Sequence, residues 1–243
     1  MKWYPPRSLQ HEWLDAAEVP MADLVANLTD LRWLNRYLGS HWLLCRAVQR
    51  LWRRVGSPTR LRVLDVGTGA GDIPAVLLRW GARRGVRLTV VGLDRHSGIL
   101  QYLRTTEPAS ASIPYVQADG LCLPFRPQTF DIVVCSTMLH HLDWLPGSAL
   151  LRSMATVARY GVVVNDLLRG WLPYYAARLL FAVTACHPVT RHDGALSVLR
   201  AYRVAEVRAM AQHAGVAPVQ ISTALGYRWM LVYTRPGDAM SEA

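Results

Sequence analysis

The sequence predicts an α/β protein built on a mostly parallel sheet, with helices on both faces and an antiparallel final strand. Three observations lead to this prediction. Short apolar runs alternate with helical segments from Arg60 to Asn165, which is typical of parallel strands joined by crossover helices. A glycine-rich turn follows the first of these runs, beginning at Gly67. Two closing strands are joined through Gly226, where the chain reverses.

The elements of this sheet follow one another at short intervals. Strands are expected at 61–66, 87–93, 113–117, 130–135, 161–165, 220–224 and 229–234. Helices are expected at 73–83, 99–105, 148–157 and 205–215. Because parallel neighbours need a crossover connection, the helices between strands are expected to pack on the faces of the sheet.

A helical segment precedes the sheet. Leucines recur at helical spacing from Leu24 to Leu38, and Gly39 offers a stop before a second helix that begins near His41. The segment 12–55 is therefore expected to be helical. A Gly-Ser-Pro turn ends it, so we expect an N-terminal helical cap at 1–57.

The remaining residues, 58–243, are expected to form the sheet domain. Within it, residues 167–200 break the strand rhythm with an apolar, aromatic insertion that begins at Trp171. We expect this insertion to be helical and to form a lid.

Composition places the chain among globular proteins. Hydrophobic residues make up 51% and charged residues 18% of the 243 residues, enough apolar side chains for a sizeable core. The formal net charge is +10, and Lys2 is the lone lysine among arginines. The arginines are scattered over expected helix ends and loops, so nucleic acid is not the expected substrate.

The compartment follows from cysteine usage and from the apolar runs. Cys45, Cys122, Cys135 and Cys186 lie far apart and form no C-x-x-C pair, which argues against a disulfide framework and a zinc site. The N-terminus shows no signal-peptide pattern. The most apolar stretch, 171–186, is short for a membrane span. We expect a cytoplasmic protein without a transmembrane segment.

Acidic residues follow three consecutive strands. Asp65 lies at the end of the first strand, before Gly67, Gly69 and Gly71. Asp94 ends the second strand, where a carboxylate accepts hydrogen bonds from ribose hydroxyls. Asp119 follows the third strand. The glycine spacing differs from G-x-G-x-x-G, which disfavours a dinucleotide enzyme.

These motifs resemble those of class I S-adenosylmethionine-dependent methyltransferases. Residues 63–72, Gly92-Leu93-Asp94, 118–125 and 130–136 look like the first four motifs of that family, in order. The resemblance implies a Rossmann-like sheet and S-adenosylmethionine as the cofactor. It assigns the methionine end of the cofactor to Asp65 and the three glycines. The residues that we expect to bind the cofactor are Asp65, Gly67, Gly69, Gly71, Asp94, Arg95, Asp119, Gly120 and Ser136.

The expected catalytic residues lie after the fourth and fifth strands. There the stretch Leu139-His140-His141-Leu142 and a fifth strand that ends in Asp166 resemble small-molecule and sugar O-methyltransferases of natural-product pathways. By that resemblance His140 is the base and Asp166 its partner. Quinone-type C-methyltransferases resemble the same stretch, and in them the histidine pair serves only to shape the pocket.

The acceptor is expected to be a small, lipophilic or aromatic hydroxylated molecule, because the insertion is rich in aromatic side chains. Candidate substrate residues are His141, Trp171, Tyr174, Tyr175 and His192. No metal is expected, since His187, His192 and Asp193 are poorly spaced for a shared ion. A quinone C-methyltransferase, a cyclase or isomerase on the same fold, and an RNA-modifying enzyme remain alternatives, and a homodimer remains open.

Overall fold

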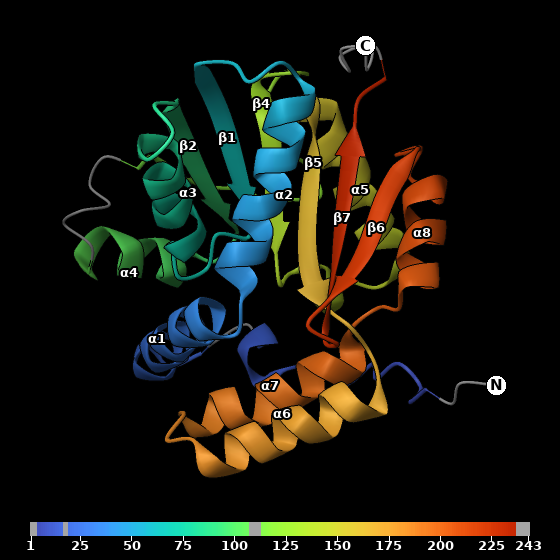
Figure 1. Ribbon diagram of the computed structural model, residues 1–243. Coiled ribbons are helices and arrows are strands. Elements are labelled where there is room, and N and C mark those ends of the chain that lie inside the picture. Colours follow the sequence, from blue (N-terminus) through green and yellow to red (C-terminus); the bar gives the residue numbers. More distant parts are fainter. Residues whose placement is uncertain (1–3, 17–18, 107–112, 237–243) are drawn as a thin grey trace.

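A computed structural model describes residues 4–16, 19–106 and 113–236 (Figure 1). In chain order its elements are η1 (Trp13–Asp15), α1 (Met21–Tyr37), α2 (Ser40–Arg54), β1 (Arg60–Val66), α3 (Asp72–Ala82), β2 (Arg87–Asp94), α4 (Ser97–Thr106), β3 (Tyr115–Gln117), β4 (Phe130–Ser136), η3 (Leu139–His141), α5 (Trp144–Val157), β5 (Ala158–Leu167), α6 (Trp171–Val183), α7 (Pro188–Arg200), α8 (Val204–His213), β6 (Val219–Ala224) and β7 (Arg228–Thr234).

The predicted sheet is confirmed. Its seven strands follow the order β3-β2-β1-β4-β5-β7-β6. The first five strands pair in parallel, whereas β7 runs antiparallel to both β5 and β6. The strand order reverses between β1 and β4, so the loops after these strands diverge at the carboxyl edge and leave room for a ligand.

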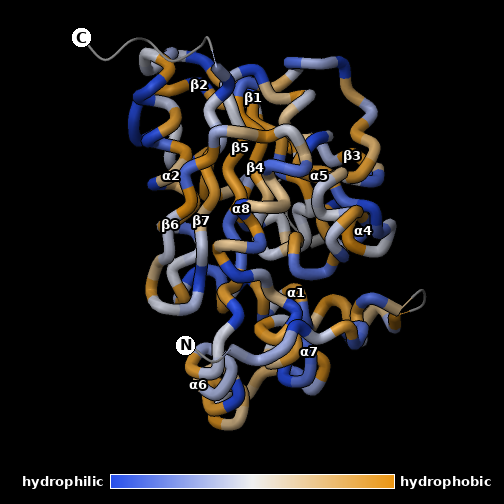
Figure 2. The backbone as a smooth tube through the Cα atoms, turned by 90° about the vertical axis from the view of Figure 1, so that its right-hand side faces the viewer, coloured by the Kyte–Doolittle hydropathy of each residue, from blue (hydrophilic) through white to orange (hydrophobic). Residues whose placement is uncertain are grey.

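Helices cover both faces of the sheet, as predicted. Buried side chains of α2 and α3, such as Leu51 and Leu77, pack on one face with Val163 of β5. On the other face α5 and α8 pack against the neighbouring Val162 and Val164. Because both faces are covered, the central strands are apolar along most of their length, as Figure 2 shows for β1, β4 and β5.

A second helical layer lies at the carboxyl edge of the strands. It consists of η1, α1, α6 and α7 (Figure 1). The insertion forms the helices α6 and α7, which pack against each other, and α7 also contacts α1, η1 and η3. Asn27 of α1 donates a hydrogen bond to Thr190 of α7 over 3.1 Å. This layer therefore faces the edge where the motif residues lie.

The N-terminal segment differs from the expectation of a helix beginning at residue 12. Among the residues described before α1, the short turn η1 is the only helical element, and α1 begins after Pro20. A proline disfavours helical backbone in the residue before it, so the helix cannot extend back through this position. The second helix, α2, packs on β5 and β7. The packing is thus continuous across the boundary predicted at residue 57.

Within the described residues, no helix combines the length and the apolar character needed to cross a membrane. The four cysteines are all free thiols.

Candidate active site

The glycine-rich loop between β1 and α3 is held against the end of β2. The backbone N–H groups of Gly67 and Thr68 donate to the carbonyl oxygen of Leu93 over 2.8 and 2.9 Å. Gly69 has a φ of +47°, and a Cβ added there would meet nothing within 4 Å. The backbone at Gly69 therefore faces open space and is accessible to a ligand.

Asp65 lies under this loop and is 1% exposed. Among the described residues, neither carboxylate oxygen has a hydrogen bond of ordinary geometry. The nearby Thr68 hydroxyl acts to lower the pKa of this carboxyl, but burial outweighs it. Burial raises the pKa of Asp65 to about 8. A buried carboxyl in this state favours a ligand that brings a positive charge or hydrogen-bond donors.

Asp94 ends β2 beside the loop. Its Oδ2 accepts the N–H of Gly69 over 3.1 Å, and its Oδ1 accepts that of His96 over 3.0 Å. Burial raises the pKa of this carboxyl. Each oxygen keeps a further lone pair, so the side chain can still accept hydrogen bonds from a ligand. Asp65 and Asp94 thus flank one loop, as the sequence predicted.

The other residues predicted to bind the cofactor lie in different surroundings. Arg95 and Asp119 are exposed, and Asp119 accepts the N–H of Leu121 over 2.9 Å. Gly120 is buried, and a Cβ there would lie 3.0 Å from Val66, so packing alone accounts for this glycine. Ser136 accepts a hydrogen bond from Asn165 over 3.1 Å and joins the sheet to α2. Contact of these four residues with a cofactor stays a prediction.

The structure brings His140 and Asp166 together. His140 lies in the η3 turn after β4, and Asp166 near the end of the adjacent β5. Nδ1 of His140 lies 2.7 Å from Oδ1 of Asp166, and the backbone N–H of His140 donates to Oδ2 over 3.0 Å. The Asp166 carboxylate therefore fixes both the ring and the backbone of His140.

Both members of this pair are buried, at 3% and 1% exposure. Burial alone would raise the pKa of Asp166, but the His140 ring and the hydrogen bonds outweigh it and lower that pKa. The carboxylate is thus held ionised behind the ring. This arrangement sets the tautomer of His140 so that Nδ1 carries the hydrogen and Nε2 is directed away from Asp166.

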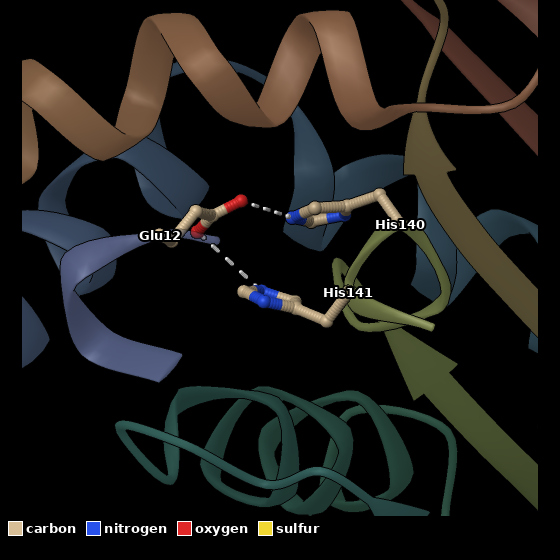
Figure 3. A group of neighbouring side chains, drawn as sticks. All are labelled: Glu12, His140 and His141. Carbon is tan, nitrogen blue, oxygen red and sulfur yellow. Dashed lines mark ion pairs between the residues drawn. The ribbon is translucent and has the colours of Figure 1, made fainter. Parts of the chain in front are cut away.

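Glu12 faces the other side of His140, and no motif or periodicity in the sequence pointed to this residue. It precedes η1 in the N-terminal segment, and its Oε1 lies 3.8 Å from Nε2 of His140 (Figure 3). Oε2 lies 3.8 Å from Nε2 of His141. The side chain is 5% exposed, and burial raises its pKa to about 7. Ser197 of α7 donates a hydrogen bond to it over 2.9 Å.

His141 belongs to the same cluster. Its Nδ1 lies 3.0 Å from Oδ1 of Asp15, at the end of η1. Burial acts to raise the pKa of Asp15, yet its contacts with His141 lower that pKa to about 2. The side chain of His141 is 30% exposed. It therefore connects the buried His140 with the surface.

Two arginines hold the backbone of the histidine turn. Nη2 of Arg7 donates to the carbonyl oxygens of His140 and Leu142 over 3.1 and 2.9 Å. Nη2 of Arg200, at the end of α7, donates to the carbonyl oxygen of His141 over 2.8 Å. Composition and charge could not distinguish these two arginines from those on the surface. They fix the turn from the N-terminal segment and from the insertion.

The aromatic residues predicted for the acceptor lie at the start of α6. Trp171 and Tyr175 stack at 5.9 Å between centroids, and Tyr174 lies 5.2 Å from Tyr175. It is α7 that contacts η3, while the extensive contact of α6 is with α7. The role of these rings at the acceptor stays a prediction.

His192, the last of the predicted acceptor residues, lies near the cluster but is engaged elsewhere. Its ring stacks on Trp13 at 4.1 Å between centroids, and its Nδ1 lies 2.8 Å from Oδ1 of Asp193. Asp193 in turn accepts the backbone N–H groups of Trp13 and Leu14. These contacts fasten η1 to α7.

Comparison with known proteins finds relatives for the central part of the chain and for the fold. Residues 63–161 match the family model of a methyltransferase domain. A stretch of 127 residues is 35% identical to the ubiquinone/menaquinone biosynthesis C-methyltransferase UbiE of Xanthomonas campestris, over 49% of this chain and 48% of that protein. Another of 100 residues is 35% identical to the demethylmenaquinone methyltransferase of Deinococcus radiodurans, over 39% and 40%. The chain spans about half the length of the curated relatives that it matches.

Solved structures share the fold across most of the chain. A S-adenosylmethionine-dependent methyltransferase from Aquifex aeolicus superposes with a TM-score of 0.58 at 15% identity, covering 89% of this chain and 99% of that one. Magnesium protoporphyrin IX methyltransferase from Synechocystis, solved with bound S-adenosylhomocysteine, has a TM-score of 0.54 at 18% identity, covering 82% and 84%. The matched domain contains Asp65, Asp94 and His140, whereas Glu12 and Asp166 lie outside it.

Proposed function

We propose that this chain, whose residues 63–161 form a methyltransferase domain within a class I fold, transfers a methyl group from S-adenosylmethionine to an oxygen of a small, lipophilic or aromatic hydroxylated molecule. The observation that carries the proposal is the buried His140–Asp166 pair, with 2.7 Å between Nδ1 and Oδ1. This pair lies at the carboxyl edge of the sheet, where ligands bind in open α/β folds.

The cofactor fits the glycine loop as the structure has it. The buried oxygens of Asp65, which have no hydrogen bond of ordinary geometry among the described residues, suit the positively charged methionine end. The open space at Gly69 allows the ligand to lie against the backbone. Asp94, beside the loop, supplies acceptors for the ribose hydroxyls. When bound, the cofactor supplies a methyl group on a positively charged sulfur.

The proposed reaction is a direct displacement. The bond between the methyl carbon and the sulfur breaks, and a bond between that carbon and the acceptor oxygen forms. The hydroxyl proton goes to Nε2 of His140, which makes His140 the catalytic base. Asp166 is a positioning residue, because it holds the ring and stabilises the imidazolium that results. The products are S-adenosylhomocysteine and the methylated acceptor.

The insertion is proposed to select the acceptor. Its helix α7 contacts the η3 turn that carries His140, and α6 adds the aromatic cluster of Trp171, Tyr174 and Tyr175 next to α7. Aromatic and aliphatic side chains around a few polar groups are typical of sites for lipophilic molecules. The acceptor proposed is therefore a phenol or a related aromatic hydroxyl compound.

The relatives favour a second candidate, C-methylation of a quinone precursor. UbiE and demethylmenaquinone methyltransferase are named for reactions of that class. In a carbon methylation the proton leaves the ring carbon after the methyl group has been added, so a base is again required. The position of the new methyl group separates the two candidates.

The test uses S-adenosylmethionine with an isotopically labelled methyl group and a panel of phenols and hydroquinones. Wild type is expected to give a labelled product whose methyl group is on oxygen, as determined by NMR of the purified product. General-base catalysis typically contributes about 10² to 10⁴ in rate, so His140→Ala is expected to lose about that much kcat. Asp166→Asn should lose less.

Cofactor affinity provides the control for that experiment, since neither variant touches the glycine loop. Calorimetry should show the same affinity for S-adenosylhomocysteine in wild type and in His140→Ala. Transfer of label to carbon would contradict the O-methylation and support the second candidate. A His140→Ala enzyme of normal kcat at saturating acceptor would contradict the assignment of the base.

A further inference from the structure

Three side chains from distant parts of the chain converge beside the catalytic pair. Glu12 comes from the N-terminal segment, and His140 and His141 come from the η3 turn. Figure 3 shows both imidazole rings directed at the Glu12 carboxylate, which lies 3.8 Å from each Nε2. One oxygen of Glu12 and one nitrogen of each ring all lie within 4.8 Å of one another.

The remaining nitrogen of each ring is bound by a carboxylate. Nδ1 of His140 lies 2.7 Å from Asp166, and Nδ1 of His141 lies 3.0 Å from Asp15. Histidines that bind metal ions usually donate their other N–H in this way, because the hydrogen bond fixes the ring and leaves the second nitrogen free as a ligand. Here the same arrangement occurs twice, and both free nitrogens point to one place.

The charges around the cluster favour a cation. Glu12 is 5% exposed, and the carboxylates of Asp15, Asp166 and Asp193 surround it. Arg200 lies beside them, with its Nε 3.8 Å from Glu12 and its Nη1 3.0 Å from Asp15, and the buried Arg228 interacts with Asp166. With both rings neutral, these two guanidiniums offset only part of the charge of the four carboxylates. A divalent cation between the rings and Glu12 would offset the remainder.

We propose that Glu12, His140 and His141 bind a divalent transition-metal cation of the zinc class. Two imidazole nitrogens and one carboxylate oxygen suit Zn²⁺, Fe²⁺, Co²⁺ or Ni²⁺, whereas Mg²⁺ and Ca²⁺ prefer oxygen ligands alone. Zinc bonds of about 2.0 to 2.1 Å hold tetrahedral ligand atoms roughly 3.4 Å apart. The two separations of 3.8 Å run to different oxygens of Glu12, and the three ligand atoms lie within 4.8 Å of one another, so metal binding requires the ligand atoms to close by up to about 1.4 Å.

This inference revises the expectation from the sequence that no metal binds. That expectation depended on His187, His192 and Asp193, which are close in sequence. The sequence could not show that Glu12 lies across from the histidine pair, since the segment before α1 has no periodicity that predicts its path.

The inference rests on the proposed function and changes one role in it, because His140 is a ligand rather than the base when the metal is bound. Three protein ligands leave at least one coordination position open, as in catalytic zinc sites. An acceptor hydroxyl in that position would ionise more readily, because the cation stabilises the negatively charged oxygen. Its proton would then pass to solvent, and His140 would act as a ligand. In the metal-free protein, Nε2 of His140 stays available as the base.

The test measures binding of the metal alone by the full-length protein, after treatment with a chelator and removal of that chelator. Co²⁺ is titrated while its visible absorption is recorded, and Zn²⁺ is titrated by calorimetry. Wild type is expected to bind one equivalent of each, with an absorption spectrum typical of nitrogen and oxygen ligands. His141→Ala and Glu12→Gln are each expected to weaken the affinity by at least 100-fold.

Two further variants sharpen this test. Asp15→Asn changes only the carboxylate behind His141 and is expected to weaken binding by about 10- to 100-fold. His213→Ala removes an exposed histidine at the end of α8 and is expected to leave binding unchanged. Circular dichroism confirms that each variant is folded. If Glu12→Gln does not fold, the His141→Ala variant still tests the inference, because the side chain of His141 is partly exposed.

Equal affinity of wild type and His141→Ala for Co²⁺ and Zn²⁺ would overturn the inference. So would binding that is lost equally in His213→Ala. The outcome is separable from that of the proposed function. Failure to bind the metal, with methyl transfer intact, overturns the inference alone. Stoichiometric metal binding without methyl transfer to any acceptor overturns the proposed function alone.

Discussion

Asp65 shows how a single buried group links the cofactor to pH. Its pKa of about 8 lies far above the ordinary value of 3.8, because burial disfavours the charged form. The carboxyl therefore stays protonated in the folded protein between these two values, while in the unfolded chain it is ionised. Its contribution to stability is present below pH 3.8 and is lost as the pH rises towards 8.

Binding of S-adenosylmethionine is expected to release a proton from Asp65. The ligand brings positive charge next to the carboxyl, which lowers its pKa and ionises it. At pH 6 to 7 calorimetry in buffers of different ionisation enthalpy should detect the release of up to one proton per bound cofactor. Asp65→Asn should release none. Proton release that is the same at pH 9.5 as at pH 6.5 would contradict the assignment.

Substitution of Asp94 is expected to weaken binding of the cofactor product. Asp94→Ala removes the acceptor for the ribose hydroxyls and frees the N–H of Gly69, which Asp94 now accepts over 3.1 Å. Hydrogen bonds to a charged group contribute about 1.5 to 3 kcal/mol each, so the Kd for S-adenosylhomocysteine should rise by about 100-fold or more. Asp94→Asn keeps one acceptor oxygen and should lose less. An unchanged Kd in the alanine variant would exclude this site.

At the scale of elements, a partly buried ion pair joins the segment after β5 to the start of α8. Nη2 of Arg169 lies 2.6 Å from Oε1 of Glu206, and Nη1 donates to the carbonyl oxygen of Ala201 over 2.6 Å. Burial acts to raise the pKa of Glu206, but its hydrogen bonds to Arg203 and Arg169 outweigh burial and lower that pKa below 4.5. The pair fixes the segment that follows the insertion.

Glu206→Gln is expected to lower the free energy of unfolding by about 1 to 3 kcal/mol at pH 7, because it leaves the Arg169 guanidinium without its charged partner. A group with a lowered folded pKa contributes stability above its ordinary pKa, and that stability is lost as the pH falls through the folded value. The difference between wild type and variant should therefore shrink below about pH 4.5. Urea unfolding at pH 7 and at pH 3.5 measures it. A difference that does not depend on pH would contradict this role.

Across the whole molecule, the features that could be predicted from the sequence were those with a regular pattern of residues. The alternation of apolar runs and helices predicted the sheet, and the resemblance to O-methyltransferases predicted the pairing of His140 with Asp166. Glu12 could not be predicted, because its segment is held by tertiary contacts such as those between Asp193 and η1 and has no periodicity of its own.

The positions of the surface arginines likewise depend on tertiary packing. Arginines that the sequence predicts to be scattered over helix ends and loops come together from α2 and α3 around a cavity of about 580 Å³. The arginines that line it are Arg46, Arg50, Arg53, Arg79, Arg83 and Arg84. Helix packing, rather than the order of residues, brings these arginines together. A charge count along the chain therefore could not distinguish a shared cavity from two separate exposed faces.

Cofactor binding should stabilise the whole fold, because the glycine loop joins β1, β2 and α3. A ligand at 100 times its Kd stabilises the folded state by about 2.7 kcal/mol. For a protein of this size each kcal/mol raises Tm by about 2 to 4 °C, so S-adenosylhomocysteine should raise Tm by about 5 to 11 °C. Scanning calorimetry with a chelator present separates this effect from that of a metal. Asp94→Ala, at the ligand concentration used for wild type, should shift by less than half as much. An equal shift in both proteins would mean that the ligand stabilises the fold from a site away from β2.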